Sequence, residues 1–492
     1  MPYLHGNMVD RDLANIVALL DQLRPALKQG DRARLVDITR QLVALRAPVG
    51  RQWEKLAQIA AANGELTLAR AAIDLFVGSQ GGGPNAQYQK VGLLTFIGAW
   101  REAHALLHAL PADSPSPIAQ AYSRGAAALY SGKAEEARHE LERATQLDPR
   151  SGSAWYLLSL AVDFASEPAL ADRLIAAERG MGNAPPGEQA AYLHALGKLH
   201  DGRGEHALAF AAFTRAGAQM KAAQPYDVDG DRNRAADAVR GYSAERIAAI
   251  AGRQREPTAR TIFVTGLPRS GTTLVQQILT SHGDVSDGAE IARMSLLAQD
   301  IGGLSWDALS TYVEAHGVAP AARLWDHWMD ERFPGSRRVV DKSVDASRAL
   351  GIAATLLPDA PLIWVTRDPL DCAWSCYRTC FLNLPWTSDL QDIALHFRLE
   401  AELLAQWQQI LGERLLVVPY EALVASPQGW IRRILRHCGL SEESQVFAPH
   451  ENRLTPATPS LMQVRRPINR DSIGAAEPYR PFLEPFIKAY FG

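Results

Sequence analysis

The chain has 492 residues, of which 47% are apolar and 21% charged, and its net charge is −3. This length exceeds one ordinary core and predicts two or three domains. The charge balance gives no reason to expect a nucleic-acid partner, and four cysteines are too few for a disulfide framework. No apolar run is long enough for a bilayer, and the N-terminal residues lack a basic segment followed by an apolar one. We therefore expect a cytoplasmic protein without membrane contact.

The first half contains an internal repeat of 34 residues. Its turn positions hold five glycines and one serine, with a four-residue insertion before the last copy: Gly30, Gly64, Gly98, Gly132, Ser166 and Gly204. Five residues later stand Leu35, Ala69, Ala103, Ala137, Ala171 and Ala209. Four further on stand Thr39, Ile73, Leu107, Leu141, Ile175 and Phe213. This phasing predicts antiparallel helix pairs, with glycine in each turn, the small residue at the helix crossing, and the larger residue filling the space toward the next repeat.

The phasing resembles the tetratricopeptide repeat, with about six copies between residues 16 and 223. The resemblance implies an all-α solenoid over residues 1–223, with a concave face that commonly binds peptides or protein segments. We expect a peptide or protein acceptor to be held there. The array can instead form a homodimer or only brace the second domain. Residues 224–257 are expected to be a linker, with a polar break at 224–232 and one helix from about 233 to 253.

The second domain is expected to span residues 258–492. Buried strands are predicted at 261–264, 362–366 and 415–418, and a helix at 390–410. Strands that alternate with helices predict an α/β fold with a parallel sheet, whose ligands bind at the carboxyl ends of the strands.

The loop after the first of these strands, GLPRSGTT at 266–273, has the spacing of a phosphate-binding loop, but Thr272 stands where a nucleotide hydrolase has lysine. Backbone N–H groups and the following helix N-terminus can still bind an anion. A degraded nucleotide hydrolase and a merely structural turn are the alternatives. Arg269, beside Ser270 and Thr273, favours an anion with a guanidinium at the reacting group.

A second motif, RDPLDCAWS at 367–375, follows the strand at 362–366. Arg367 leaves the carboxyl end of that strand, and Ser375 is expected in the helix that Pro369 opens. A guanidinium and a hydroxyl together can hold a phosphate. The alternative for Arg367 is an ion pair with Asp368 or Asp371.

Together the two motifs resemble those of sulfotransferases that use 3′-phosphoadenosine 5′-phosphosulfate (PAPS), in particular the tyrosylprotein sulfotransferase branch. The resemblance implies a P-loop-type three-layer domain and PAPS as the donor. Its implied cofactor-binding residues are Pro268, Arg269, Ser270, Gly271, Thr272, Thr273, Arg367, Ser375, Tyr420, Ser460, Arg466 and Asn469. Its implied catalytic residues are Glu290, Arg269, Lys342 and Ser460.

By this resemblance Glu290 is the general base, and Arg269 and Lys342 neutralise charge on the sulfuryl group. Ser460 donates a hydrogen bond to the leaving phosphate. His282 is the rival base and is expected to be structural, and Lys342 can instead pair with Asp341. No metal is implied. Cys372, Cys376 and Cys380 lie four residues apart and are interpreted as a buried helical stripe.

Two positions differ from the family pattern. The basic residues expected after Ser472-Ile-Gly474 are absent, so Arg465, Arg466 or Arg480 is expected to replace them. Ala292 and Leu296 stand where animal tyrosylprotein enzymes have arginines that recognise acidic peptides, so that specificity is not carried over. The leading hypothesis is sulfuryl transfer to tyrosine in a peptide or protein. The alternatives are transfer to a small metabolite, glycan or lipid hydroxyl, and a repeat scaffold with an inactive nucleotide-binding domain.

Overall fold

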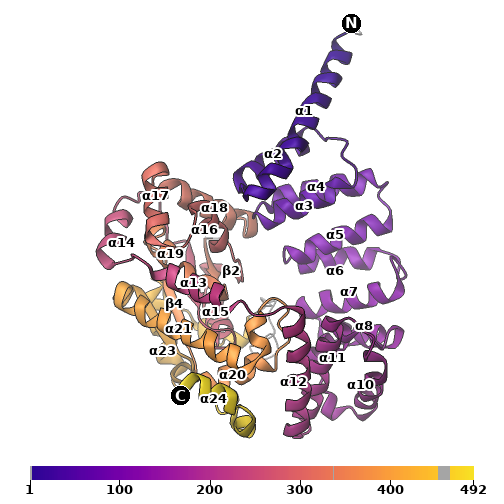
Figure 1. The fold of residues 1–492 in the computed structure, drawn as a ribbon, viewed down its shortest axis with the longest axis vertical. Coiled ribbons are helices and arrows are strands. Elements are labelled where there is room, and N and C mark those ends of the chain that lie inside the picture. Colours follow the sequence, from indigo (N-terminus) through magenta and orange to yellow (C-terminus); the bar gives the residue numbers. More distant parts are fainter. Residues whose placement is uncertain (1–2, 336, 453–465) are drawn as a thin grey trace.

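The computed structural model describes residues 3–335, 337–452 and 466–492. Figure 1 shows an arch of helix pairs that faces an α/β domain. The helices of the arch are α1 (Tyr3–Gln29), α2 (Arg32–Ala44), α3 (Gln52–Ala62), α4 (Leu66–Ser79), α5 (Pro84–Phe96), α6 (Trp100–Ala109), α7 (Pro117–Tyr130), α8 (Ala134–Leu147), α9 (Gly152–Ala161), α10 (Pro168–Met181), α11 (Pro186–Gly202) and α12 (His206–Ala223). No helix within the described residues has the length and apolar character needed to cross a membrane.

The repeat pattern is confirmed in the turns and at the helix crossings. All five turn glycines have a positive φ, between 65° and 86°, which a glycine adopts without a Cβ penalty. The small residues five positions later are all buried. The prediction for Ile175 is wrong, because its side chain is 39% exposed and Leu174 is buried instead. Pro168 starts α10 after a 3-10 turn at Phe164–Ser166, and the inward-facing position comes three rather than four residues after Ala171.

The single helix predicted at about 233–253 is also wrong, because the structure has two helices. Helix α13 (Val228–Val239) starts inside the predicted polar break, where Asp227 accepts a hydrogen bond from the Gly230 N–H at 2.9 Å. Gly241 then adopts φ 80°, and Ser243 caps α14 (Ala244–Ala251). Turn and capping residues inside the predicted helix therefore divide it.

Asp231 on α13 fixes these connecting helices to the α/β domain. Its buried carboxylate lies 2.8 Å from Arg348 Nη2 and 2.7 Å from His396 Nδ1, and it accepts a hydrogen bond from the Tyr226 hydroxyl at 2.6 Å. Arg348 belongs to the 3-10 segment Val344–Ala349, and His396 to helix α21 (Leu390–Leu411). Burial opposes ionisation, but the hydrogen bond from His396 and the charge of Arg348 outweigh it and hold the pKa of Asp231 well below its usual range.

The α/β domain is built on a five-stranded parallel sheet in the order β2-β3-β1-β4-β5. Its strands are β1 (Thr261–Thr265), β2 (Val285–Ala289), β3 (Arg338–Asp341), β4 (Leu362–Thr366) and β5 (Leu415–Pro419). The remaining helices are α15 (Thr272–Thr280), α16 (Met294–Ile301), α17 (Trp306–His316), α18 (Ala319–Arg332), α19 (Leu350–Leu356), α20 (Pro369–Tyr377), α22 (Tyr420–Ala425), α23 (Pro427–His437) and α24 (Glu484–Phe491).

Alternation along the strands gives the domain three layers. Ile262 and Val264 of β1 pack in one core with α15 and α23, whereas Phe263 packs in the other with α18, α19 and α21. The predicted strands at 261–264, 362–366 and 415–418 and the predicted helix at 390–410 are confirmed to within a residue. Strands β2 and β3 were not predicted, because VSDGA and RVVD are short and partly polar.

The arch contacts the α/β domain at both of its ends (Figure 1). Near the N-terminal end, Arg32 of α2 lies 2.7 Å from Asp300 of α16. At the other end, Phe210 of α12 stacks on Phe482 with 5.0 Å between ring centroids, and Arg378 lies 2.6 Å from Asp201 of α11. Helices α5–α7 lie between these two contacts (Figure 1).

Candidate active site

The predicted site residues lie in a row along the carboxyl edge of the sheet. Glu290 directly follows β2, Lys342 follows β3, the glycine-containing loop follows β1, Arg367 follows β4, and Tyr420 follows β5. Neighbouring parallel strands are about 4.8 Å apart, so five segments that are distant in sequence meet at one edge. This edge is where open α/β sheets bind ligands.

Two glycines let the backbone of the loop pass very close to its neighbours. Gly266 has φ 142°, and a Cβ there would meet the Val365 carbonyl oxygen at 2.4 Å. Gly271 has φ 104°, and a Cβ there would meet the Tyr420 ring at 2.5 Å. Arg269 also has a positive φ, 69°, which costs a residue with a side chain about 1–2 kcal/mol. Backbone strain in a loop is often found at ligand-binding sites.

The loop presents polar groups suited to an anion. Ser270 is 1% exposed, and its hydroxyl oxygen has no hydrogen-bond partner among the described residues. Thr272 and Thr273 open α15, whose first-turn N–H groups have no acceptor within the helix. An anion at this position would satisfy these donors.

The cysteine stripe lies under the loop. The thiols of Cys372 and Cys376 are buried and donate to the Pro268 carbonyl oxygen at 3.1 and 3.3 Å. Burial raises the pKa of Cys376 well above its usual value. The interpretation as a buried helical stripe is confirmed for these two residues and is wrong for Cys380, which follows the end of α20 and is partly exposed.

The structure brings Arg269 and Ser375 together, although they are 106 residues apart. The Arg269 Nε–H donates to the Ser375 hydroxyl at 2.9 Å, and Ser375 lies on α20, which begins at Pro369 as predicted. Burial, together with the nearby Arg378, lowers the pKa of Arg269. A bound anion would offset this desolvation.

Arg367 is held by backbone carbonyls. Its Nη1 donates to the Arg269 carbonyl at 2.9 Å, and its Nη2 donates to the Ser472 carbonyl. Its guanidinium lies 5.0 Å from the centre of the Tyr420 ring. The alternative ion pair with Asp371 is only a 3.9 Å contact, and Nε of Arg367 has no partner among the described residues. Asp371 is instead used by the chain itself, accepting from the Gly474 and Ala476 N–H groups at 2.8 and 2.9 Å.

Glu290 and Lys342 form an ion pair at the opposite end of the row. Lys342 is 3% exposed, and its Nζ donates to Glu290 Oε1 at 2.6 Å. No described residue donates to the second carboxylate oxygen of Glu290, and this side chain is 48% exposed. The alternative pairing of Lys342 with Asp341 is wrong, because Asp341 accepts from the Ser343 hydroxyl at 2.5 Å and from the Ser343 N–H at 3.1 Å. Ser343 in turn accepts from the Ala292 N–H at 2.7 Å, which fixes the segment after Glu290.

Of the other predicted residues, those within the described ranges do not join this row. Ser460 and Arg465 lie outside the described residues. Arg466 and Arg480 are exposed. Among the described residues the hydrogen bonds of Asn469 are local, such as its amide donating to the Pro467 carbonyl at 3.0 Å. His282 is 2% exposed and lies 3.1 Å from the Ser441 carbonyl, which agrees with a structural role.

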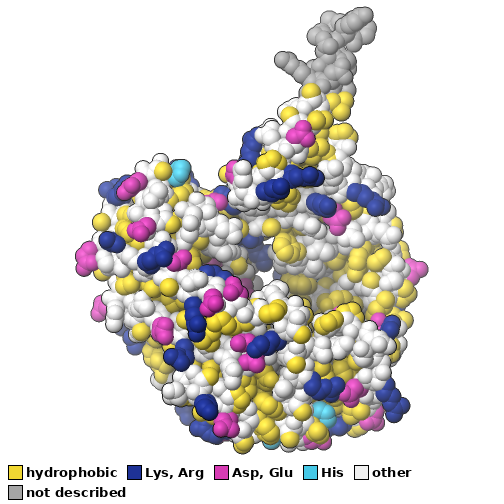
Figure 2. All heavy atoms as spheres, viewed as in Figure 1, with side chains coloured by type: hydrophobic (Ala, Val, Ile, Leu, Met, Phe, Trp, Pro, Cys, Tyr) yellow, Lys and Arg dark blue, Asp and Glu magenta, His cyan; other side chains and the backbone are white. Residues whose placement is uncertain are grey.

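A cavity of about 580 Å³ opens at Glu290 and Lys342, between the α/β domain and the arch. Figure 2 shows the hollow, with apolar side chains on the wall formed by the arch. Sequence reasoning missed several residues that line it, namely Gln276, Thr280, Arg293, Trp100, Tyr130 and Arg332. Arg293 and Arg332 also donate to the Ala61 and Ile97 carbonyls of the arch. No local motif marks these residues, because the cavity is assembled from segments of the arch and of the α/β domain that are more than 140 residues apart.

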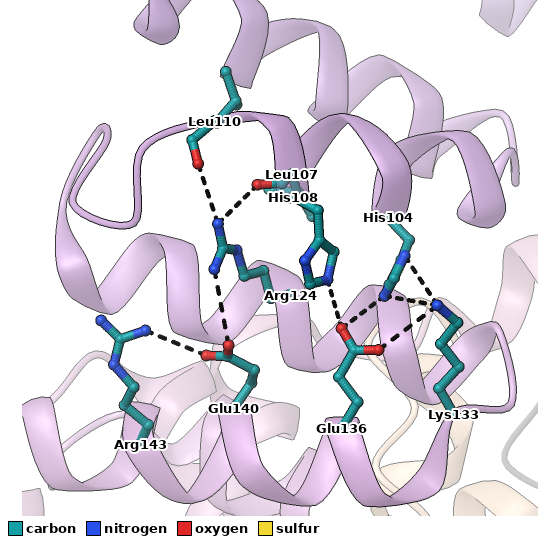
Figure 3. Close-up of polar contacts among 9 residues, drawn as sticks. All are labelled: His104, Leu107, His108, Leu110, Arg124, Lys133, Glu136, Glu140 and Arg143. Carbon is teal, nitrogen blue, oxygen red and sulfur yellow. Dashed lines mark hydrogen bonds and ion pairs between the residues drawn. The ribbon is translucent and has the colours of Figure 1, made fainter.

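One cluster within the described residues has ligand atoms close enough to hold a metal ion: His104 and His108 of α6 with Glu136 of α8. Figure 3 shows that Lys133 shares this network, with Nζ 3.7 Å from the Glu136 carboxylate and 3.4 Å from His104 Nε2. Burial opposes ionisation of Glu136, but the hydrogen bonds from His104 and His108 outweigh it and lower the pKa of Glu136. The ammonium of Lys133 thus already supplies the cation, and the network joins two helices of the arch.

Comparisons with known proteins agree with the sheet-edge motifs. Residues 261–444 match the model described as the sulfotransferase family. An uncharacterized protein of Aquifex aeolicus is 26% identical over 306 residues, which are 60% of this chain and 40% of that protein. A protein-tyrosine sulfotransferase of Drosophila melanogaster is 24% identical over 242 residues, which are 43% of this chain and 46% of that protein. The chain therefore spans less than half the length of either relative.

Among solved structures, the sulfotransferase domain from the curacin biosynthetic pathway is 17% identical and has a TM-score of 0.30. The matched region covers 46% of this chain and 99% of that domain. The family match includes all five strands of the sheet and the residues that follow their carboxyl ends. Residues 261–444 thus match the sulfotransferase family and follow an all-helical region.

Proposed function

We propose that this protein transfers a sulfuryl group from PAPS to an acceptor hydroxyl. The observation that carries the proposal is the row of functional groups at the sheet edge. A loop suited to an anion lies in the middle of the row, Arg367 lies on one side of it, and the Glu290–Lys342 pair lies on the other. This order separates a nucleotide-binding end from a proton-accepting end.

The residues present fit the donor. The buried Ser270 hydroxyl, the first turn of α15 and the guanidinium of Arg269 suit the 5′-phosphosulfate. Arg367 and Ser375 suit the 3′-phosphate, and Tyr420 offers an aromatic ring beside Arg367. Pro268, Gly271, Thr272 and Thr273 complete the loop. When bound, PAPS supplies the activated sulfuryl group.

The chain contributes positioning, charge and a proton acceptor. Glu290 accepts the proton of the acceptor hydroxyl on its unpaired carboxylate oxygen, while Lys342 holds the other oxygen in place. The ammonium of Lys342 and the guanidinium of Arg269 stabilise negative charge that develops at the transferred group. Removing the base costs such a reaction about 10²- to 10⁴-fold in rate.

We further propose tyrosine in a peptide or protein as the acceptor. A phenol has a pKa near 10, far below that of an alkyl alcohol, so a carboxylate can accept its proton more readily. The similarity to a relative described as a protein-tyrosine sulfotransferase supports this choice. The opening of the Glu290 cavity toward the arch, whose pattern resembles peptide-binding tetratricopeptide arrays, supports it as well.

An acceptor screen tests the proposal. Purified full-length protein is incubated with sulfate-labelled PAPS and, separately, tyrosine peptides, serine peptides, simple phenols and sugars, with Glu290→Gln as the control. We expect label on tyrosine peptides and its loss in the variant. Binding of adenosine 3′,5′-bisphosphate without transfer to any acceptor would contradict the enzymatic proposal and favour a nucleotide-sensing scaffold.

A further inference from the structure

A second cavity, of about 400 Å³, continues from the Glu290 cavity along the inner face of the arch. The two cavities share Thr95, Trp100 and Tyr130 in their walls. The second cavity, which we call the aromatic chamber, is lined mainly by helices α5, α7 and α9 and by Cys380 and Leu382 of the α/β domain. A molecule whose reacting hydroxyl lies at Glu290 can therefore extend into this chamber.

The wall of the aromatic chamber is uncharged. None of its lining residues is Asp, Glu, Lys, Arg or His, and its largest members are Tyr88, Trp100, Tyr122, Tyr130 and Tyr156. The rings of Trp100 and Tyr130 lie 4.5 Å apart, and the Tyr88 hydroxyl lies 2.7 Å from the Ser123 hydroxyl. Burial raises the pKa of Tyr122 to about 12 and also raises that of Tyr130, so these phenols stay neutral at physiological pH.

Exposed apolar side chains mark the same surface. Phe96, on the Glu290 cavity, is 66% exposed, and Leu382, on the aromatic chamber, is 60% exposed. Large apolar side chains that are gathered at one concave surface indicate a binding site more often than chance exposure does. Covering them with an apolar group of an acceptor is favourable.

We propose that the aromatic chamber binds an uncharged apolar residue that lies close to the acceptor tyrosine in a polypeptide. The assignment rests on the proposed function and specifies its substrate. An acidic flanking residue would lose its hydration in the chamber and find no cationic partner there. At the one peptide position that enters it, the chamber therefore selects an apolar residue over an acidic one.

The size of the preference follows from burial of one side chain. Moving a leucine or phenylalanine side chain out of water increases affinity by about 10- to 100-fold. An acidic residue gains nothing comparable and is disfavoured by desolvation.

A glycine in the chamber wall provides a blocking variant. Gly92 lies on helix α5, and a Cβ added there would meet no atom within 4 Å. Gly92→Phe thus puts a ring into the chamber without a clash at its Cβ. Gly78 is the matched control, because it is also helical and open at Cβ but lines neither cavity.

The test measures peptide binding by fluorescence anisotropy in the presence of adenosine 3′,5′-bisphosphate, with the full chain. Three labelled peptides each carry one tyrosine. Its neighbours are leucine and phenylalanine in the apolar peptide, serine and glycine in the serine peptide, and aspartate and glutamate in the acidic peptide. We expect the apolar peptide to bind at least about tenfold more tightly than the serine peptide, and the acidic peptide to bind most weakly. Gly92→Phe should remove the advantage of the apolar peptide, and Gly78→Phe should keep it.

Tightest binding of the acidic peptide, or an unchanged preference in Gly92→Phe, would overturn the assignment. Titration of each variant with adenosine 3′,5′-bisphosphate confirms that it is folded. This test of the chamber is independent of the proposed function, because peptide binding is measured without any sulfuryl transfer. Preferential, Gly92-dependent binding without sulfation would support the chamber and contradict the enzyme.

Discussion

The two ends of the candidate site are built in different ways. The donor end consists of the loop at 266–273, Arg367 and Tyr420, which directly follow strands of one sheet, and of Ser375 on α20. The acceptor end combines Glu290 and Lys342 of the sheet with a wall of helices that come more than 150 residues earlier. The donor end depends on backbone conformation and buried charge, whereas the aromatic chamber beside the acceptor end has an uncharged lining. The chemistry and the choice of acceptor thus reside in different parts of the chain.

The largest expected effect is on kcat, and it comes from changing Glu290 at the acceptor end. Glu290→Gln keeps the shape of the side chain but cannot accept the proton, so we expect kcat to fall by about 10²- to 10⁴-fold. Affinity for adenosine 3′,5′-bisphosphate should stay unchanged in calorimetric titration, because Glu290 lies at the opposite end of the row from Arg367. Full turnover in this variant would mean that another group is the base.

The next effect concerns protein stability, at the junction between the connecting helices and the α/β domain. Asp231→Asn leaves His396 without its buried carboxylate and Arg348 with Glu400 as its remaining carboxylate partner, and we expect a loss of about 1–3 kcal/mol in the free energy of unfolding. Urea denaturation at neutral pH measures it. Asp229→Asn, at a carboxylate whose side chain is 90% exposed, is the matched control and should change stability little.

The same carboxylate predicts a pH dependence. Its pKa is lower in the folded protein than in the unfolded chain. The stability that ionised Asp231 contributes is therefore fully present above the pKa of this residue in the unfolded chain, near about 3.9. It is lost as pH falls through the lower pKa of Asp231 in the folded protein. We expect the difference in stability between wild type and Asp231→Asn to shrink as pH falls below about 4. A difference that grows toward acid pH would contradict this assignment.

A smaller effect is expected at the donor end itself. Arg367→Ala removes a buried guanidinium suited to a phosphate, and we expect affinity for adenosine 3′,5′-bisphosphate to fall by about 10- to 100-fold. Arg367→Lys should restore little, because lysine cannot donate to two carbonyls in a planar geometry. Binding to the full chain is read by calorimetry. Unchanged affinity in Arg367→Ala would place the 3′-phosphate elsewhere.

The smallest effect is expected where the arch contacts the domain near its N-terminal end. Arg32→Ala removes a partly buried ion pair with Asp300 and a cation–π contact of 5.2 Å with Trp328, at a cost of about 1 kcal/mol in stability. Peptide affinity should weaken while bisphosphate affinity stays constant. A double-mutant cycle with Asp300→Ala isolates the interaction energy of the ion pair. A change in the affinity of Arg32→Ala for adenosine 3′,5′-bisphosphate would contradict the division between the two ends.

These point variants are more informative than removal of the arch. Phe210 of α12 packs against Trp374, with 6.3 Å between ring centroids, on the helix that carries Ser375. Deleting residues 1–223 would expose this cluster beside the donor end. Loss of activity in such a truncation would therefore not separate acceptor recognition from damage to the domain.

The donor end could be predicted from the sequence because strand, turn and helix signals surround each of its residues. The predicted positions of Arg269, Arg367 and Ser375 meet in space, since parallel strands bring their carboxyl ends to one edge. The acceptor wall could not be predicted in this way. Trp100, Tyr130 and Arg332 become neighbours of Glu290 only through the curvature of the arch, which no local motif encodes.

The errors in secondary structure have local physical causes. A 3-10 turn before Pro168 changed which side chain of α10 faces inward, so Leu174 rather than Ile175 is buried. Gly241 and the capping residue Ser243 divided the helix expected near 233–253. Turn and capping geometry therefore determined which side chain is buried and where the helix ends, and the repeat periodicity did not predict either.

A single-turnover reaction tests the central claim most directly. Full-length protein in excess is mixed with sulfate-labelled PAPS and the apolar-flanked tyrosine peptide, and the fate of the label is followed by chromatography and peptide mapping. The account predicts label on the tyrosine oxygen, with its appearance slowed by about 10²- to 10⁴-fold in Glu290→Gln. Label that remains on the donor, in protein that binds both adenosine 3′,5′-bisphosphate and the peptide, would contradict it.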